Sequence, residues 1–381
     1  MTEIDGRRPR RVLYLSGTRA DFGLMRSTLQ RAAAHPALQL EVVATGMHLS
    51  SAHGHTVDEI RSAGLTVAAE IPVDVTTRTQ ASMSASIGEC LQGMTRVLTQ
   101  RRPDVLLLLG DRGEMLAGAI AALHIGVVTV HIHGGERSGT VDEPVRHAIS
   151  KLSTYHLVAT PESRERLERM GEKPAHILVT GAPGLDGLAE LGLATFPQGF
   201  ISPSGQPFVL ALFHPVVQQV SETYAQTSAL CQALHAIGLP VIWLEPNADA
   251  GSLEVLRALD DFPLPAGSRR IQHLPRSQFC SAMRQCVVMV GNSSSGIIEA
   301  ATFGTPVVNL GVRQCLRERN ANVLDVAVEA GAIRTAMQTA IAHGPWPCDN
   351  VYGDGHAGER IVQFLTCASI DPSLILKANA Y

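Results

Sequence analysis

The chain has 381 residues, 45% of them hydrophobic and 4% aromatic, and a formal net charge of −4. This length exceeds what one hydrophobic core usually holds, so we expect two domains of ordinary size. The slightly acidic composition argues against a nucleic-acid-binding protein. No apolar run is long enough to cross a membrane and no apolar segment follows the polar first residues, so we expect a soluble, cytoplasmic protein without a membrane partner.

The cysteines indicate neither a cross-link nor a metal site. They are odd in number, widely separated and include no C-x-x-C pair, so neither a disulfide framework nor a zinc site is predicted. We expect reduced thiols, and we expect neither a metal nor another cofactor. The seven positions are Cys90, Cys231, Cys280, Cys286, Cys315, Cys348 and Cys367.

Apolar runs alternate with amphipathic stretches through the first half of the chain, which is typical of a doubly wound parallel sheet. We expect residues 1–10 to be a flexible leader. Helix-separated strands are expected at residues 12–15, 40–44, 65–71, 105–109, 127–132 and 156–159. Because ligands of such sheets bind beyond the carboxyl ends of the strands, the residues after each strand are candidates for the functional site.

Two loops at these strand ends carry charged side chains. The loop after the first strand, G-T-R-A-D-F-G at 17–23, combines glycines with a cation at Arg19. The loop after the fourth strand, G-D-R-G-E at 110–114, places Asp111 and Arg112 at the same edge of the sheet. Asp111 can act in catalysis or can cap the following helix, and the sequence leaves both interpretations open.

The fifth strand carries His131 and His133, which point the same way, and it leads through two glycines to Glu136. Two such histidines can bind a metal, but buried strand histidines more often form hydrogen bonds, and no third ligand has a diagnostic spacing. Asp142 and Arg146 follow at the start of a helix, four residues apart. They form either a surface ion pair or, beside the glycines, part of a functional site.

A boundary between domains is predicted at residues 181–184 and in the Pro-, Gly- and Ser-rich stretch 196–207. A second alternating series follows, with strands at 208–213, 241–244, 270–273, 287–290 and 307–310. We therefore expect a first domain of residues 1–182 and a second of residues 183–356, with residues 357–381 packing back onto the first. Two Rossmann-like α/β domains then face one another across a cleft.

Residues 287–313 are expected to form a strand, a loop, a helix at 295–303 and a second strand. The loop G-N-S-S-S at 291–295 brings backbone N–H groups and hydroxyls together at a helix N-terminus, which suits a phosphate, although the serines can serve only as helix caps. Glu299, one turn later, can accept hydrogen bonds from a ribose or can be an ordinary solvated carboxylate. A phosphate site beside a ribose site indicates a nucleotide.

Other strand ends of the second domain add polar groups. His214 precedes a proline after the first strand, Asn247 lies in the loop after the second, and Arg313 follows the last, with Arg317 and Arg319 beyond it. The histidine can be structural and the basic loop can be solvated. Because parallel strand ends meet at one edge, we expect these groups beside the serine loop, where the arginines offer cations to phosphates.

Together these motifs resemble the UDP-N-acetylglucosamine 2-epimerase family, and its hydrolysing branch in particular, over nearly the whole chain. They are G-T-R-A-D-F-G (17–23), G-D-R-G-E (110–114), H-G-G-E-R-S-G-T-V-D-E-P-V-R-H-A-I-S-K (133–151), P-N-A-D-A-G-S (246–252), G-N-S-S-S-G-I-I-E (291–299) and Y-G-D-G (352–355). The non-hydrolysing branch carries Pro-Glu where this chain has Ala20-Asp21. The resemblance implies a glycosyltransferase-B-like fold. It also implies conversion of UDP-N-acetylglucosamine, or a UDP-2,4-diacetamido-trideoxyhexose, into UDP and a free 2-acetamido-manno sugar.

The resemblance further implies roles for individual residues. The implied UDP-binding set is Arg19, Arg112, His214, Asn247, Ser293, Ser294, Glu299 and Arg313, and the implied sugar-site set is Asp111, Asp142 and Arg146. Where several members carry a glutamate that is a candidate acid/base, this chain has His133, so either His133 or Glu136 takes that role. The implied partner is a UDP-sugar and the implied assembly a homo-oligomer, either a dimer or a tetramer. The alternatives are a non-hydrolysing 2-epimerase and a non-catalytic regulator that binds UDP-sugars.

Overall fold

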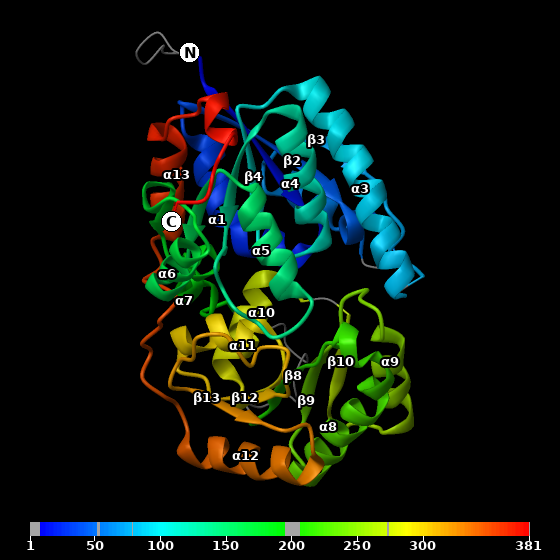
Figure 1. Ribbon diagram of the computed structural model, residues 1–381. Coiled ribbons are helices and arrows are strands. Elements are labelled where there is room, and N and C mark those ends of the chain that lie inside the picture. The colour runs from blue at the N-terminus through cyan, green and yellow to red at the C-terminus, as the bar shows by residue number, and fades with distance from the viewer. Residues whose placement is uncertain (1–7, 52–53, 78, 195–205, 273, 381) are drawn as a thin grey trace.

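The computed structural model describes residues 8–51, 54–77, 79–194, 206–272 and 274–380. Within them the chain forms two parallel β-sheets with helices on both faces, the first in the upper half of Figure 1 and the second in the lower half. No helix in these residues has the length and apolar character needed to cross a bilayer. The predicted α/β architecture with two doubly wound sheets is confirmed.

The first sheet has the strand order β3-β2-β1-β4-β5-β6-β7. Its strands are β1 (Arg10–Ser16), β2 (Leu38–Thr45), β3 (Val67–Ile71), β4 (Val105–Leu109), β5 (Val128–Ile132), β6 (Tyr155–Val158) and β7 (Ile177–Val179). Its helices are α1 (Arg19–Ala34), α2 (Val57–Ser62), α3 (Gln80–Arg101), α4 (Gly113–Ile125), α5 (Asp142–Leu152), α6 (Pro161–Arg169) and α13 (Ala357–Cys367), with 3₁₀ turns η1 (Gly46–Leu49), η3 (Pro174–His176), η4 (Pro183–Leu185) and η7 (Pro372–Ile375). The short helix α7 (Leu188–Leu191) follows η4 and packs against helices of the second sheet. Alternate strand residues reach opposite faces, so Val12 and Tyr14 pack against α1 and α13 while Leu13 and Leu15 pack against α3 and α4.

The second sheet has the order β10-β9-β8-β11-β12-β13. Its strands are β8 (Val209–Leu212), β9 (Val241–Leu244), β10 (Arg269–Ile271), β11 (Val288–Gly291), β12 (Val307–Leu310) and β13 (Val323–Val326). Its helices are α8 (Thr223–Ile237), α9 (Ser252–Asp261), α10 (Arg276–Gln285), α11 (Ser294–Ile298) and α12 (Ala330–His343), with 3₁₀ turns η5 (Val217–Glu222) and η6 (Ala300–Phe303). Leu234 of α8 and Met337 of α12 pack with Val209 on one face, and Met283 of α10 packs with Leu210 on the other.

Several details differ from the sequence-based expectation. Strands β7 and β13 were not predicted, because both are short edge strands and neither forms a long apolar run. The helix expected at 295–303 is interrupted at Glu299, where α11 ends and η6 begins. Residues 1–7 of the expected leader, residue 273 and most of the expected boundary stretch 196–207 lie outside the described residues.

The last helix, α13, packs against α1 and contributes Ile361 and Leu365 to the core of the first sheet. The carboxylate of Asp186 holds the start of this helix by accepting hydrogen bonds from the backbone N–H groups of Ala357 (2.9 Å) and Gly358 (2.6 Å). A Cβ at Gly358 would lie 2.7 Å from the Thr28 hydroxyl of α1, so only glycine allows this close approach. Both ends of the described chain therefore belong to the domain of the first sheet.

A buried carboxylate fixes the segment that follows α13. Glu172, whose side chain is 2% exposed, pairs with Lys151 at 2.8 Å, His156 at 3.0 Å and Lys377 at 2.6 Å. Lys377 also donates to the backbone oxygen atoms of residues 150 and 153. Burial alone would raise the pKa of Glu172, but the hydrogen bonds from these three partners lower it to about 2. The ionised carboxylate thus stabilises the fold.

We predict that Glu172→Gln lowers the free energy of unfolding by about 3 kcal/mol at neutral pH, because the largely buried ammonium group of Lys377 and the partly exposed one of Lys151 lose their counterion. The contribution of Glu172 is complete above its ordinary pKa of 4.5 and is lost as the pH falls to about 2, so the two proteins should converge over this window. Urea unfolding at several pH values measures this. The exposed pair of Glu165 and Arg169 provides the control, because Glu165→Gln should change little. Equal stability of Glu172→Gln and the natural chain at pH 7 would contradict the prediction.

Candidate functional site

In each sheet, successive strands are added first toward one edge and then toward the other. The change occurs between the neighbouring strands β1 and β4 in the first sheet and between β8 and β11 in the second. Loops that follow strands on either side of such a point leave room for a ligand. The two sets of loops face one another, because Arg112 after β4 forms an ion pair with Asp249 after β9 at 3.4 Å. Arg112 also pairs with Glu114 at 3.3 Å, and the carboxylate of Glu114 raises its pKa.

The loop after β1 leads to two charged residues with different roles: Asp21 is a structural carboxylate, and Arg19 is an unpaired cation among the described residues. Asp21 is buried and closes a capping box with Thr18 at the start of α1, where it also accepts from the backbone N–H of Gly17 at 3.0 Å. Arg19 is only partly buried and forms no hydrogen bond or ion pair with any described residue. Burial lowers the pKa of Arg19, to about 10. Its guanidinium remains charged at neutral pH and is free to bind an anion.

The structure tests the capping interpretation of Asp111. Arg112, not Asp111, occupies the N-cap position of α4, and no side chain caps this helix. The Asp111 carboxylate instead accepts a hydrogen bond from Arg146, and Arg317 of the second domain lies 3.9 Å from it. The capping interpretation is therefore wrong. Asp111 is held at the strand end by two guanidinium groups.

The expected ion pair between Asp142 and Arg146 does not form. Arg146 is 1% exposed and points away from the helix surface to Asp111, to the backbone oxygen of Glu136 at 3.1 Å and to the Ser138 hydroxyl at 3.4 Å. The tertiary contacts override the four-residue spacing, because a buried guanidinium needs several acceptors. Asp142, the first residue of α5, is partly buried, and its carboxylate forms no hydrogen bond or ion pair with the described residues.

His133 and Glu136 form a buried pair in the loop after β5. His133 has a left-handed backbone (φ 63°), and its Nδ1 shares a hydrogen with the carboxylate of Glu136. The other ring nitrogen, Nε2, is buried and has no hydrogen-bond partner. Burial, and then the charge of Arg317, lower the pKa of His133 to about 3. The ring is therefore neutral at physiological pH, and with the hydrogen on Nδ1 it offers a lone pair at Nε2.

Glu136 is also bound from the other domain. Arg317, in the loop between β12 and β13, donates to the carboxylate of Glu136, and its Nε donates to Gln314 at 2.6 Å. Arg317 was expected to offer a cation to phosphates, and in the structure its guanidinium pairs with Glu136 and Gln314. Arg319, which was also expected to offer a cation to phosphates, pairs with Asp325 at 2.9 Å. The loop that carries both arginines thus reaches Glu136 and Asp111 of the first domain.

His131 has a different environment from His133. Its Nε2 donates to the backbone oxygen of Gly110 at 2.8 Å, and its Nδ1 contacts the Ser150 hydroxyl at 3.1 Å. Both ring nitrogens are thus used to join β5 to its neighbours. Among the residues that the structure describes, no three His, Cys, Asp or Glu side chains are grouped so as to hold a metal ion.

Asn292 organises the loops of the second domain. Its side chain accepts from the backbone N–H of His214 at 2.7 Å and donates to the backbone oxygen of His214 at 2.8 Å. The backbone oxygen of Asn292 accepts from Arg313 at 3.0 Å and Gln314 at 3.2 Å. Burial, and then the charge of Arg313, lower the pKa of His214 to about 3, and its buried Nδ1 has no partner. Asn292 thereby brings a neutral imidazole and a guanidinium to one place.

In the serine loop, residues 291–295, some polar groups are used in the fold and others have no partner among the described residues. Gly291 (φ 138°) turns the chain beside β8, where a Cβ would lie 1.8 Å from the backbone oxygen of Leu212. Ser293 caps α11, and its hydroxyl also contacts that of Ser295 at 2.8 Å. Ser294 and Asn247 are partly buried and form no side-chain hydrogen bond with the described residues. The capping interpretation therefore accounts for Ser293 alone among the three serines.

Glu299 is not a solvated surface carboxylate. It is 2% exposed and pairs with Arg276, which also donates to the backbone oxygen of Gly184 at 3.1 Å. Arg276 was missed by the sequence analysis, since an arginine at the start of α10 carries no motif. Burial alone would lower the pKa of Arg276, but the charge of Glu299 raises it. This pair fixes Glu299 where α11 meets the first domain.

The sequence profile of the family described as UDP-N-acetylglucosamine 2-epimerase matches residues 30–366. The chain belongs to the UDP-N-acetylglucosamine 2-epimerase family. One similar protein is the UDP-N,N'-diacetylbacillosamine 2-epimerase (hydrolyzing) of Legionella pneumophila. Its sequence is 46% identical to this chain, over 98% of this chain and 100% of its own length. The resemblance inferred from the motifs is confirmed.

Solved structures show the fold of the family. The crystal structure of UDP-GlcNAc 2-epimerase from Neisseria meningitidis bound to UDP-GlcNAc superimposes with a TM-score of 0.77 at 19% identity, over 93% of this chain and 99% of that one. A calicheamicin glycosyltransferase superimposes with a TM-score of 0.51 at 15% identity, over 96% of each chain. The predicted glycosyltransferase-B-like fold is thereby confirmed for this member of the family.

We predict that Arg317→Met raises the pKa of His133 by about one unit or more, because the variant removes a nearby cation and leaves the imidazole beside the carboxylate of Glu136. Titration of protein labelled with ¹⁵N-histidine, followed by NMR, measures this pKa. Arg319→Met is the matched control, because Arg319 pairs with Asp325 and should leave the titration unchanged. An unaltered His133 titration in Arg317→Met would show that the cation does not set the state of the imidazole.

Proposed function

We propose that the chain is a hydrolysing 2-epimerase that releases UDP and a free 2-acetamido-manno sugar, and that its preferred substrate is a UDP-2,4-diacetamido-trideoxyhexose. The observation that carries this is the full-length similarity to a relative named as a hydrolysing epimerase of a diacetamido sugar nucleotide. UDP-N-acetylglucosamine is the second substrate to test, because the family as a whole is named for it.

We also propose that the protein works in the cytoplasm as a dimer or tetramer. Light scattering can test this oligomeric state.

The reaction needs an electrostatic environment for UDP and acid/base groups for the sugar. The C2 proton is not acidic by itself, but departure of UDP from C1 builds positive charge in the ring and allows that proton to leave. The products of this elimination are UDP and a glycal. Water then adds across the double bond, with its hydroxyl at C1 and a proton at C2 on the face opposite the original one, which gives the manno sugar.

We assign the second domain to UDP. Arg313 is held beside His214 through Asn292, and its guanidinium can stabilise the charge that develops on the departing diphosphate. The hydroxyls of Ser293 and Ser294 provide hydrogen bonds to the same group. Arg19 and Arg112 approach from the first domain, Asn247 from the loop after β9, and Glu299 is proposed to bind the ribose.

We assign the sugar chemistry to the loops of the first domain. The carboxylate of Asp142, which has no hydrogen-bond partner in the described residues, is the proposed base that takes the C2 proton. Asp111 is fixed by Arg146 and is proposed to orient the sugar and its leaving group. These roles require carboxylates in two environments, one paired and one open.

The structure favours His133 over Glu136 as the further acid/base group. Both carboxylate oxygens of Glu136 already have partners, one in His133 and the other in Arg317, whereas Nε2 of His133 has none. Glu136 then acts as the positioning residue that keeps the hydrogen on Nδ1. We propose that Nε2 accepts a proton from the water that adds to C1 and returns it to C2 on the same face, so that no net proton remains on the imidazole.

We predict that incubation with UDP-2,4-diacetamido-trideoxyhexose releases UDP and the free manno-configured sugar, with a higher kcat/KM than UDP-N-acetylglucosamine run in parallel. A coupled assay follows UDP, and NMR identifies the sugar. Formation of a UDP-linked 2-epimer without free UDP would assign the chain to the non-hydrolysing reaction. Binding of UDP without turnover of either substrate would instead favour a regulator.

We predict that Asp142→Asn and Asp111→Asn each lower kcat by roughly 10²-fold or more, the usual effect of removing a positioned acid/base group. UDP affinity should change little, because neither carboxylate belongs to the proposed UDP site. Glu143→Gln is a nearby control on α5 that alters a carboxylate outside the proposed reaction. If Asp142→Asn weakens UDP binding while turnover at saturation stays intact, Asp142 is a binding residue.

We predict the opposite pattern for the second domain. Glu299→Gln and Arg313→Ala should each weaken UDP binding by about 1.5 to 3 kcal/mol, the usual loss for a charge-assisted hydrogen bond. Calorimetric titration with UDP measures this without any turnover. Arg284→Ala, an arginine at the far end of α10, serves as the control for Arg313→Ala. Unchanged UDP affinity in both variants would remove these residues from the nucleotide site.

A further inference from the structure

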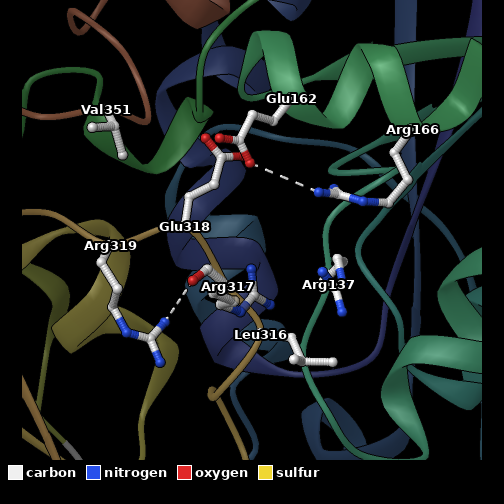
Figure 2. Close-up of a pocket in the computed structure, with 8 residues that line it drawn as sticks. All are labelled: Arg137, Glu162, Arg166, Leu316, Arg317, Glu318, Arg319 and Val351. Carbon is white, nitrogen blue, oxygen red and sulfur yellow. Dashed lines mark hydrogen bonds and ion pairs between the residues drawn. The ribbon is translucent and has the colours of Figure 1, made fainter.

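A polar cavity lies at the contact between the domains, and Arg317, the partner of Glu136, is part of its wall. Its volume is about 240 Å³, and both domains supply its wall. The lining residues are Arg137 from the loop before α5, Glu162 and Arg166 from α6, Leu316, Arg317, Glu318 and Arg319 from the loop between β12 and β13, and Val351 (Figure 2). We call this cavity the arginine pocket. None of the residues assigned above to UDP or to the sugar chemistry lines it.

Positive charge dominates the wall, because four arginines face two glutamates. Three of the arginines already have partners. Arg317 binds Glu136, Arg319 binds Asp325, and Arg166 donates to the backbone oxygen of Gly135. Arg166 also lies 3.8 Å from Glu162, but the side chain of Glu162 is 64% exposed, so water screens this pair.

Arg137 is the exception in this wall. Its side chain is exposed and forms no hydrogen bond or ion pair with any residue that the structure describes. The charge of Arg137 reaches Arg166, whose pKa is lowered by burial first and by this second cation next. Two like charges held near each other on one wall favour a negative group between them.

The remaining wall suits the organic part of a ligand. Leu316 and Val351 are 39% and 48% exposed, which is unusual for large apolar side chains beside so many charges. The cavity is larger than a phosphate ion needs and smaller than a typical drug-sized site, so its size fits a compound of about one sugar ring. The second glutamate, Glu318, also lines the pocket, where its carboxylate lies beside that of Glu162 and accepts a hydrogen bond from Thr160 (Figure 2).

We propose that the arginine pocket binds a small organic anion, a carboxylate or a phosphate, through the guanidinium groups of Arg137 and Arg166. The apolar side chains of Leu316 and Val351 contact the remainder of that ligand. This site is distinct from the UDP site, and its existence does not rest on the proposed reaction.

The pocket shares one residue with the proposed catalytic loops. Arg317 lines it and at the same time binds Glu136, the positioning residue of His133. Arg166 donates to Gly135, which directly precedes Glu136, and Gly135 lies so close to α6 that a Cβ would be 2.3 Å from the backbone oxygen of Ser163. An anion in the pocket attracts both guanidinium groups and loosens their hold on this loop. We therefore infer that occupancy of the pocket lowers kcat, and this second part does rest on the proposed function.

The binding test uses the full chain saturated with UDP, so that the nucleotide site is already filled. Calorimetric titration with glucuronate, a hexose-sized carboxylate, should give saturable binding with a Kd of roughly 1 mM, as one or two charge-assisted bonds provide. Inorganic phosphate should bind more weakly, because it does not reach the apolar wall. Stronger binding of phosphate would identify the ligand as a free phosphate instead of an organic anion.

Arg137→Ala should weaken glucuronate binding about tenfold or more, since one charge-assisted bond is lost. Arg164→Ala is the matched control, because Arg164 lies on α6 but pairs with Glu168 outside the pocket. Thermal unfolding should be the same for both variants. Absence of saturable binding, or equal binding by Arg137→Ala and the natural chain, would overturn the proposed site.

The kinetic test measures turnover of the UDP-sugar at increasing glucuronate. We expect a lower kcat with unchanged KM in the natural chain and in Arg164→Ala, and no effect in Arg137→Ala. Inhibition that raises only KM and persists in Arg137→Ala would place the anion at the UDP site and overturn the coupling. An inactive protein that still binds glucuronate would refute the proposed reaction while leaving the pocket supported.

Discussion

The ion pair between Arg317 and Glu136 joins the two domains where their loops meet. The two side chains are only 8% and 3% exposed, and neither charge could be left alone at that depth without a large cost in free energy. The position of one loop therefore dictates the position of the other. Gln314 extends the contact from Arg317 to the backbone of Asn292, and Asn292 in turn binds the backbone of His214. One chain of polar contacts thus runs from the loop after β5 in the first domain to the loop after β8 in the second.

Neutral imidazoles are a recurring feature of this network. His133 and His214 lie on opposite sides of it, burial holds the pKa of each near 3, and each keeps one buried nitrogen without a protein partner. An unsatisfied buried polar atom is costly, so these two nitrogens are places where the protein alone leaves hydrogen-bonding capacity unused. A guanidinium beside each ring keeps it neutral, because a positive neighbour disfavours the imidazolium form.

The sequence predicts the parts of this protein that depend on local pattern. Strand β4 coincides with the apolar run 105–109, since a buried parallel strand needs apolar side chains on both faces. The edge strands β7 and β13 lack that signal. Pairings across long separations also leave no local signal: Arg317 and Glu136 are 181 residues apart, and Arg276 and Glu299 are 23 apart. The four-residue spacing of Asp142 and Arg146 is misleading, because tertiary acceptors outcompete a neighbour on the same helix.

The position of α13 has a consequence for the order in which the chain is built. The second sheet is inserted between η4 and α13, so the first domain lacks part of its core until the second sheet has been synthesised. Until then, Met25 and Leu29 on α1 have no cover from Ile361 and Leu365. The first domain is synthesised first but completes its core last, so it exposes an apolar face while the second domain is being synthesised. Exposed apolar surface of this kind makes a nascent chain prone to aggregate. The domain of the second sheet, contiguous in sequence, can complete its own fold earlier.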